Sequence, residues 1–369
     1  MRESSIASQL NPRYAGSLDE TIPPPRTLTT DRGDIGLRID LVLRRHLTDV
    51  GSATRTRVQS WIEGGLVTLN GRLVRRVATR AAPGDVLTVV LPAEVGRPLM
   101  AAEEMPVRVL YEDEHLLIVD KPAGIVVHPT HRHLAGTMMN ALLWYARTWP
   151  PASRPSIVGR LDKLTSGLVV VARTAAIHAA LQRTWSSSQT EKDYLALVYG
   201  RVSSARGVIE LGLRRDPTDR RRVIASATLG APSVTRFERA GRVAAPRVGL
   251  SLLRCRLVTG RTHQIRVHLM TQGWPIVGDP VYGSPRWKEI DDHLLAEALQ
   301  SFPRQALHAW RVAFVHPVTG RRLLVESPVP EDLADLISVS GLGRHLNVGE
   351  TGQETQSPRY QLPASHLPL

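Results

Sequence analysis

The sequence predicts an α+β protein, in which a small helical module precedes a larger domain with a mixed, mostly antiparallel sheet. In the larger domain, strand-like segments follow one another without the regular strand–helix alternation of a parallel sheet. The chain also contains neither GxGxxG nor GxxxxGK[ST], the glycine patterns of nucleotide-binding α/β folds. Its 369 residues are enough for two domains.

Composition divides the chain into four parts. Residues 1–35 and 344–369 lack a hydrophobic period and are rich in polar residues and proline, which predicts disordered tails. We expect the small module over 36–95 and the larger domain over 105–340, joined by a short linker (96–104).

The small module is expected to contain two helices and a hairpin. LRIDLVLRRHL carries its apolar residues at helical spacing. ATRTRVQSWIEGG predicts a second helix that starts near Ser52 or Thr54 and ends at the Gly-Gly pair. LVTLNGRLV alternates around Asn70-Gly71, the strongest short signal for a hairpin turn, and GDVLTVVLP adds a strand.

Basic residues dominate this module. Between residues 37 and 80 there are nine arginines and three acids. Such a surface either positions an RNA backbone or is simply a solvated helical face. Solvated faces usually mix charges of both signs, so we favour RNA binding. The arginines expected to contact RNA are Arg44, Arg45, Arg55, Arg57, Arg72 and Arg75.

The larger domain begins with VRVLYEDEHLLIVDKPAGIVVHP, which predicts two strands that bracket a turn. TMMNALLWYART predicts a helix by its period. Further strands and helices are expected in DYLALVYGRV, LLRCRLVTG, THQIRVHLMTQG and WRVAFVHPVTGRRLLVESP.

One carboxylate lies in an unusual setting. In GRLDKLTSGLVVVA (159–172), Asp162 stands between Arg160 and Lys163, just before a run typical of a strand buried on both faces. In an extended segment Arg160 and Asp162 share a face, and nearby cations keep a carboxylate ionised. Asp162 is therefore either an available nucleophile or base, or an ion pair that caps a strand.

Three other motifs contain polar residues at turns or on strands. VDKPAGIVVHP places Asp120 and Lys121 at a sharp turn. In TEKDYLALVYG, Tyr194 stands among alternating apolar residues, where it either only packs or also reaches a site. In THQIRVH, Arg266 is a candidate inward-facing partner for an acid.

Several histidines occur near these motifs, at His128, His131, His133, His263 and His268. No cysteine or acidic residue completes a usual ligand spacing around them, so we predict no metal site.

The net charge of +13 fits a nucleic-acid partner, although a basic surface can also serve solubility alone. No apolar run approaches the length of a membrane span, and the N-terminus lacks a hydrophobic signal segment. The single cysteine, Cys255, fits a reducing compartment. A cytoplasmic protein without a membrane partner is expected.

Two resemblances follow from these motifs. The small module resembles the S4-type RNA-binding domain through LRIDLVLRRHL and SATRTRVQSWIEGGLVTLNGRLVRRVATRAAPGDVLTVVLP. The larger domain resembles the RluA/RluD family of RNA pseudouridine synthases, whose motifs match KPAGIVVHP, RLDKLTSGL, KDYLALVYG, GRTHQIRVH and PIVGDPVYG in order along the chain. Together the resemblances cover about residues 37–340.

The second resemblance implies that uridine in RNA is converted to pseudouridine without a cofactor. Asp162 would be the essential carboxylate, Arg266 its ionic partner, and Tyr194 a stacking residue and candidate base for the C5 proton. Arg160 would occupy the space that the flipped base leaves. Lys121, Lys163 and His263 are also expected to contact RNA.

An S4-type module on this catalytic domain resembles the branch of the family that modifies large-subunit ribosomal RNA, which implies that RNA as the substrate, with a pre-ribosomal large subunit as one setting. A monomer is expected. A tRNA substrate and a non-catalytic RNA-binding or ribosome-assembly role remain as alternatives. One residue departs from the family pattern, because Gly159 stands where the family commonly has histidine.

Overall fold

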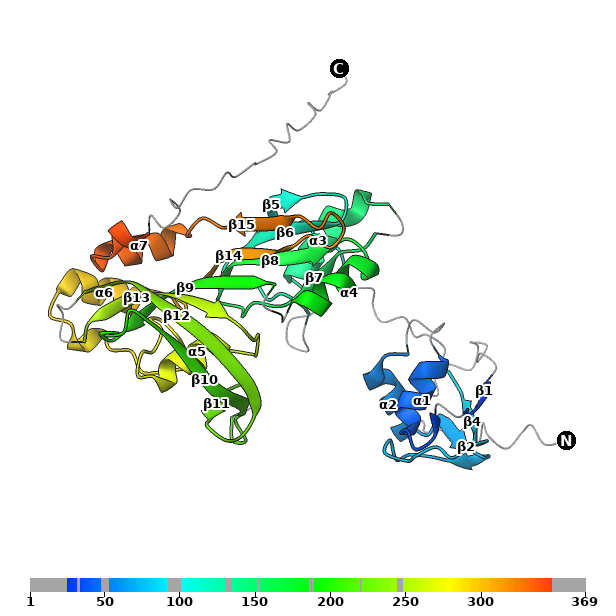
Figure 1. Ribbon diagram of the computed structural model, residues 1–369. Helices are drawn as coiled ribbons and strands as arrows, with labels where there is room; N and C mark the ends of the chain where they lie inside the picture. The colour runs from blue at the N-terminus through cyan, green and yellow to red at the C-terminus, as the bar shows by residue number, and fades with distance from the viewer. Residues whose placement is uncertain are drawn as a thin grey trace, which may run out of the picture. The chain divides into compact units, whose positions relative to one another are not determined.

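The computed structural model describes residues 25–31, 34–47, 53–91, 101–129, 135–150, 153–185, 187, 189–219, 221–243 and 248–346. The chain forms two compact units, a small unit within residues 1–99 and a large unit within residues 100–369 (Figure 1).

In the small unit, two helices share one apolar core with a four-stranded antiparallel sheet. Val42, Trp61 and Leu87, from the two helices and the sheet, all lie in this core. The second helix begins after Thr54, whose hydroxyl accepts a hydrogen bond from the Arg57 N–H, and it ends at Gly64, as predicted. The elements are α1 (Ile39–His46), α2 (Arg55–Glu63) and the sheet β1-β4-β2-β3 (Arg26–Thr29, Val86–Val89, Val67–Leu69 and Arg72–Leu73).

The predicted hairpin is confirmed. Asn70 and Gly71 both have positive φ angles, 52° and 76°, as a type I′ turn requires. The Asn70 side chain also bonds to the start of β4: it donates to Asp85 Oδ1 and accepts from the Val86 N–H, both at 2.8 Å.

The predicted limits of the small module are wrong at its N-terminal side. Residues 26–29 were expected in a disordered tail, but they form strand β1, which pairs with β4. A four-residue edge strand with one leucine has no hydrophobic period of its own, so the local sequence does not reveal it. Residues 1–24 and 347–369 of the predicted tails lie outside the described residues.

The expected linker is also too long. Asn140 donates a hydrogen bond to the Ala101 carbonyl at 2.7 Å, and the Gly136 N–H donates to Glu103. These contacts attach residues 101–103 to the large unit. Residues 96–100 lie outside the described part of the chain.

The large unit is built on an eleven-stranded sheet in the order β11-β10-β12-β13-β9-β14-β8-β6-β5, with β15 beside β14 and β7 beside β8. Among the strand pairs that the structure describes in this unit, only β14·β8 is parallel, which confirms the predicted mixed, mostly antiparallel sheet. The strands are β5 (Arg108–Glu112), β6 (Leu116–Lys121), β7 (Ser156–Val158), β8 (Ser166–Ala172), β9 (Glu191–Tyr199), β10 (Arg206–Arg215), β11 (Val223–Ser226), β12 (Ala231–Val243), β13 (Leu250–Leu257), β14 (Leu307–Val315) and β15 (Arg322–Glu326).

Strand β8 is buried at all seven positions, as its apolar run predicted. The helices of this unit are α3 (Met138–Tyr145), α4 (Ala175–Thr184), α5 (Gln264–Thr271), α6 (His293–Ser301) and α7 (Glu331–Val339), with 3₁₀ turns η4 (Ala146–Thr148), η5 (Trp287–Glu289) and η6 (Gly343–His345). Turn η6 extends into the tail predicted from residue 344.

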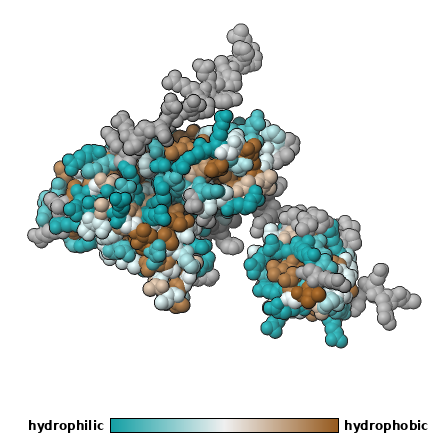
Figure 2. Space-filling view, viewed as in Figure 1, coloured by the Kyte–Doolittle hydropathy of each residue, from teal (hydrophilic) through white to brown (hydrophobic). Residues whose placement is uncertain are grey.

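The visible face of both units is largely hydrophilic, with smaller hydrophobic areas between the polar side chains (Figure 2). Among the described residues, no helix is both long and apolar enough to cross a membrane.

Candidate active site

Asp162 lies in the turn that leads from β7 into the buried strand β8. The Thr165 N–H donates to the Asp162 carbonyl at 3.1 Å, and the Gly124 N–H donates to the Lys163 carbonyl at 2.8 Å. The turn lines a cavity of about 280 Å³, whose wall also includes Tyr194, His263 and Arg266. Three sequence motifs that lie far apart in the chain therefore meet at one cavity.

Arg266 joins two carboxylates. Its Nη1 lies 2.9 Å from Asp162 Oδ2, while its Nε and Nη2 lie 2.7 and 2.8 Å from the two oxygens of Asp279. Burial acts to lower the pKa of Arg266, but hydrogen bonds and charges from Asp279 and Asp162 outweigh it and raise that pKa. Arg266 therefore remains a cation, and the predicted contact between it and an acid is confirmed.

Asp279 has no role in the sequence-based prediction. It follows β9 and α5 in the chain, in the GDPVYG motif, and its side chain is almost fully buried. The N–H groups of Val281 and Tyr282 donate to its Oδ1 at 2.9 and 3.0 Å. The GDPVYG motif could have marked Asp279 as a site residue, but the sequence alone does not show which cation its carboxylate binds.

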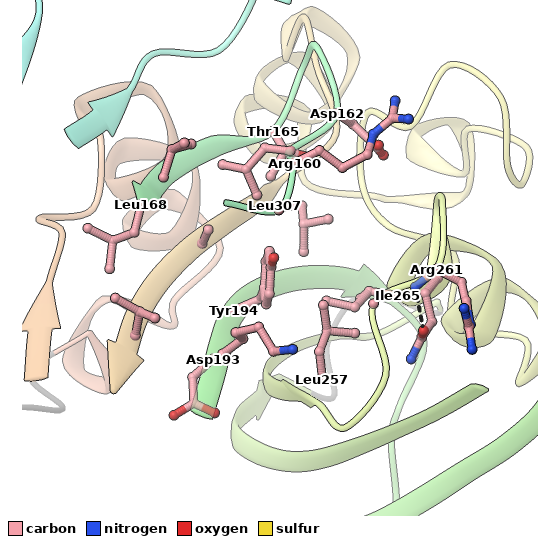
Figure 3. Close-up of a pocket in the computed structure, with 18 of the residues that line it drawn as sticks. Arg160, Asp162, Thr165, Leu168, Asp193, Tyr194, Leu257, Arg261, Ile265 and Leu307 are labelled. Atoms are coloured by element: carbon pink, nitrogen blue, oxygen red, sulfur yellow. Dashed lines mark hydrogen bonds between the residues drawn. The ribbon is translucent and has the colours of Figure 1, made fainter. Parts of the chain in front are cut away.

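Tyr194 lies on β9. It points toward the side of the cavity where Arg160 and Asp162 lie, whereas the adjacent Asp193 points the other way (Figure 3). Burial and the negative charge of Asp162 raise the pKa of the Tyr194 hydroxyl, so the phenol is neutral near pH 7.

His263 lies closer to the carboxylate than an RNA contact alone would require. Its Nε2 is 3.8 Å from Asp162 Oδ1, and its Nδ1 is 2.8 Å from the Tyr282 hydroxyl. Its backbone has a φ angle of 55°, a conformation that non-glycine residues seldom adopt. Burial lowers the pKa of His263, although the charge of Asp162 opposes that effect.

Arg160 and Lys163 are exposed. The sequence placed Arg160 on the same face as Asp162, but no ion pair within 4 Å joins either cation to this carboxylate in the described part of the chain. The ionic partner of Asp162 is Arg266 instead.

The prediction that Lys121 contacts RNA is wrong. Its side chain is fully buried, and its ammonium donates to the carbonyls of Pro122, Ile125 and Lys163 at 2.8, 3.1 and 3.2 Å. Burial lowers the pKa of Lys121 to about 7. Lys121 therefore ties its own turn to the turn that carries Asp162.

The structure explains why glycine stands at position 159. Gly159 has a φ of 84°, and a Cβ there would lie 2.7 Å from Nε1 of Trp185. Trp185 is fixed in turn by Lys192, whose Nζ donates to its carbonyl at 2.7 Å and lies 5.6 Å from the ring centroid. The indole thus occupies the space beside residue 159.

In the small unit, Arg44, Arg55 and Arg72 are exposed and form no side-chain ion pair within the described residues, while Arg57 is half-buried. Arg45 differs from them, because it binds Asp31 Oδ1 at 2.8 Å and Asp34 Oδ1 at 2.9 Å. The positive charge of Arg45 is therefore paired with carboxylates inside the small unit. Arg75 is exposed and reaches the Glu63 carbonyl at 3.4 Å.

One group in the described residues places three possible metal ligands within 4.8 Å of one another: Asp31, Asp34 and His46. Arg45 and His46 already bind the buried Asp34, so this cluster is an ion-pair network. Of the other histidines considered for metal binding, His131 and His133 lie outside the described part of the chain, and His128 lies two residues before that gap.

Known proteins match both units. Residues 115–271 match the RNA pseudouridylate synthase family, and residues 37–87 match the S4 domain. A protein of Nitrosomonas europaea named ribosomal large subunit pseudouridine synthase D is 39% identical over 310 residues, which cover 84% of this chain and 86% of that protein. Proteins of the same name from Xanthomonas campestris and Pseudomonas aeruginosa are 40% and 38% identical, over 82% and 80% of this chain and 88% and 90% of theirs.

These matches extend across both units and include the motifs that converge on Asp162. The expected fold class and enzyme class are confirmed: the chain belongs to the RNA pseudouridine synthase family, with an S4 domain in its N-terminal unit.

Proposed function

We propose that this enzyme isomerises specific uridines in large-subunit ribosomal RNA and that Asp162 is its essential carboxylate. The substrate assignment rests on the relatives, which are named for the large ribosomal subunit. The observation that supports the role of Asp162 is its contact with Arg266 at 2.9 Å inside the cavity that Tyr194 also lines.

The two oxygens of Asp162 are not equivalent. Oδ2 is engaged by Arg266, whereas Nε2 of His263 lies 3.8 Å from Oδ1. Oδ1 is thus the atom available to the ribose. It would either attack C1′ or promote a glycal-type elimination, and both routes need the ionised carboxylate that Arg266 stabilises. The N1–C1′ bond breaks, the uracil rotates, and C5 bonds to C1′.

Tyr194 would stack on the uracil during this rotation. Because its raised pKa keeps the phenol neutral, stacking needs no change of its protonation state. As the base for the C5 proton, the hydroxyl would have to release its own proton in the same step. The product differs from uridine only in which uracil atom is bonded to C1′, so the reaction consumes no second substrate.

Arg160 would occupy the space that the flipped nucleotide leaves. It is exposed at the cavity wall and is not engaged with Asp162. Base flipping costs a few kcal/mol, and a guanidinium that replaces the lost stacking offsets part of it. Lys163, also exposed beside the cavity, would contact a phosphate.

The exposed arginines of the S4 domain would position the RNA, most simply on a pre-ribosomal large subunit, with the enzyme acting as a monomer in the cytoplasm. A tRNA substrate is the second candidate, because the catalytic cavity alone does not select between folded RNAs.

Tritium release from RNA labelled with 5-³H-uridine tests the catalytic role. Wild-type enzyme should release tritium from large-subunit rRNA, and Asp162→Asn should reduce the rate by at least about 10⁴-fold, as when other enzymes lose their nucleophile. If wild type releases none from any RNA, the chain acts as a non-catalytic RNA-binding factor. Pseudouridine mapping in rRNA and tRNA of a deletion strain distinguishes the two substrates.

A further inference from the structure

A second hollow, of about 620 Å³, lies on the face of the sheet opposite Tyr194. Tyr194 pairs with Cys255, and their neighbours Asp193 and Arg256 also pair with each other, so the second pair points to the other face. We call the basic and aromatic lining of this hollow the arginine groove; it consists of Arg206, Arg236, Arg254, Arg256, Trp310 and Arg311.

The strand register brings these positive charges together. Arg236 on β12 lies directly opposite Arg256 on β13, and Glu238 lies between Arg206 and Arg254 on the two neighbouring strands. Like charges directly opposite each other destabilise a sheet. An anion bound in the groove would remove this repulsion.

The acids of the protein neutralise only part of the groove. Arg256 binds Asp193 through two nitrogens, at 2.6 and 2.8 Å, and Arg311 lies 3.3 Å from Glu191. In contrast, Arg206, Arg236 and Arg254 have no carboxylate within 4 Å among the described residues. The Nε atoms of Arg254 and Arg311 are buried and have no hydrogen-bond partner there. The groove therefore retains positive charge that the acids of the described residues do not neutralise.

Trp310 adds a flat ring to this charged surface. The β9·β14 register shifts between Ala309 and Arg311, so Trp310 is the extra residue of a β-bulge, a feature that can redirect a side chain. It lines the groove half-buried, and the Arg254 guanidinium lies 5.7 Å from its ring centroid. An aromatic ring beside arginines is how many proteins hold single-stranded RNA, with a base on the ring and phosphates on the guanidinium groups.

We propose that the arginine groove binds a single-stranded segment of the substrate RNA, outside the cavity that receives the target uridine. The groove and the catalytic cavity share Asp193 and Arg311 in their walls, so one RNA molecule can engage both. This inference rests on RNA being the substrate. An acidic polypeptide would neutralise the arginines but would make no use of the half-buried Trp310 ring.

The test measures the Kd of the full chain for a long rRNA fragment as a function of KCl concentration. The triple variant Arg206→Gln/Arg236→Gln/Arg254→Gln should reduce the salt slope of log Kd by about two, because each lost phosphate contact in single-stranded RNA contributes about 0.7. Trp310→Leu should weaken binding by about 5- to 150-fold, the usual effect of losing one stacked base. Arg154 is an exposed arginine before β7, and Arg154→Gln is the control. Its salt slope of log Kd should differ from that of wild type by no more than the contribution of one phosphate contact.

Tritium release from a short stem–loop that fills only the catalytic cavity should be unchanged in these variants. If the triple variant does not fold, 4-thiouridine crosslinking to wild type replaces it, and the crosslinked peptides should include Trp310. Three results would overturn the proposal. One is a salt slope and Kd that stay unchanged in the folded variants. The others are the absence of any crosslink to β10, β12, β13 or β14, and displacement of the bound probe RNA by polyglutamate but not by unlabelled RNA. RNA binding is measured independently of turnover. If wild type binds RNA in the arginine groove but releases no tritium, the result contradicts the catalytic proposal and still supports the RNA-binding role of the groove.

Discussion

Asp279 holds Arg266 with both of its carboxylate oxygens and leaves only Nη1 of the guanidinium to reach Asp162. Asp279 is itself fixed by the N–H groups of Val281 and Tyr282. The position of the proposed catalytic carboxylate therefore depends on a second, buried carboxylate through one planar cation. Lysine could not replace this cation, because a single ammonium lacks the fork that spans two acids.

The first prediction is that Asp279→Asn reduces kcat by about 10- to 100-fold, the usual effect of losing an outer partner that orients a functional ligand. Asparagine keeps one oxygen for the backbone donors but can no longer accept two bonds from Arg266. The Kd for RNA should stay within about two-fold, because Asp279 is buried. Single-turnover tritium release and filter binding measure the two quantities.

Asp332→Asn is the matched control. Asp332 also binds a buried arginine through two oxygens, with Arg304 Nε and Nη2 at 2.6 and 2.8 Å, but it does not line the catalytic cavity. Equal losses of kcat in both variants would mean that general destabilisation explains the effect.

The second prediction concerns Gly159 and Trp185. Gly159→Ala should destabilise the large unit by about 1–2 kcal/mol for the positive φ alone, and further because its Cβ would lie 2.7 Å from the indole. Gly320→Ala provides the control, since Gly320 has a φ of 69° and no atom within 4 Å of its would-be Cβ. When Trp185→Leu is combined with Gly159→Ala, it should restore only the stability that was lost to the clash with the indole, not the loss that comes from the positive φ. Thermal unfolding of the four proteins measures these differences, and equal losses in the two glycine variants would contradict the steric part.

Local signals in the sequence were enough to predict several features. The Asn70-Gly71 turn, the cap at Thr54 and the buried strand β8 each depend on residues within one short segment. The contact between Arg266 and an acid was also predicted, because a family motif placed an arginine among apolar residues.

Features that depend on distant partners were not predictable. Lys121 was expected at a surface, as lysines usually are, but one of its three carbonyl partners comes from Lys163, 42 residues later. Likewise, strand β1 exists because β4 supplies its hydrogen bonds. The role of Trp185 beside Gly159 also depends on a tertiary contact that no local pattern encodes.

The third prediction is that the triple variant Arg44→Gln/Arg55→Gln/Arg72→Gln reduces the salt slope of RNA binding by about two or more, since each phosphate contact contributes about 0.7 to 0.9. These side chains are exposed and unpaired within the described residues, so their loss should not affect the fold. Turnover at saturating RNA should be unchanged. The measurement is Kd against KCl concentration for the full chain.

Arg321→Gln, in an exposed turn of the large unit, controls for the loss of positive charge as such. A salt slope that stays at the wild-type value in the small-unit variant would show that the S4 domain does not hold the RNA backbone through these arginines.

The fourth prediction is a pH dependence of stability that originates at Lys121. Its pKa in the folded protein is about 7 because burial disfavours the ammonium, whereas a free lysine has a pKa of 10.5. Between these values the unfolded chain binds a proton that the folded chain has released. The free energy of unfolding should therefore rise with pH from about 7 to 10.5, by up to about 1.4 kcal/mol per pH unit. Urea unfolding at a series of pH values measures this slope.

Lys121→Met should be less stable at each pH, because three carbonyls lose a donor. It should lose the rise between pH 7 and 8 and keep only the part of the slope above pH 8 that Lys192 contributes. Lys192→Met distinguishes the two buried lysines: burial lowers the pKa of Lys192 only to about 8, so this variant should keep the rise between pH 7 and 8. If wild type and Lys121→Met have the same slope, the ammonium stays charged in the folded protein. In that case its three carbonyl partners and the negative charge of Asp162 compensate for burial, and Lys121 is a permanent cation beneath the catalytic turn.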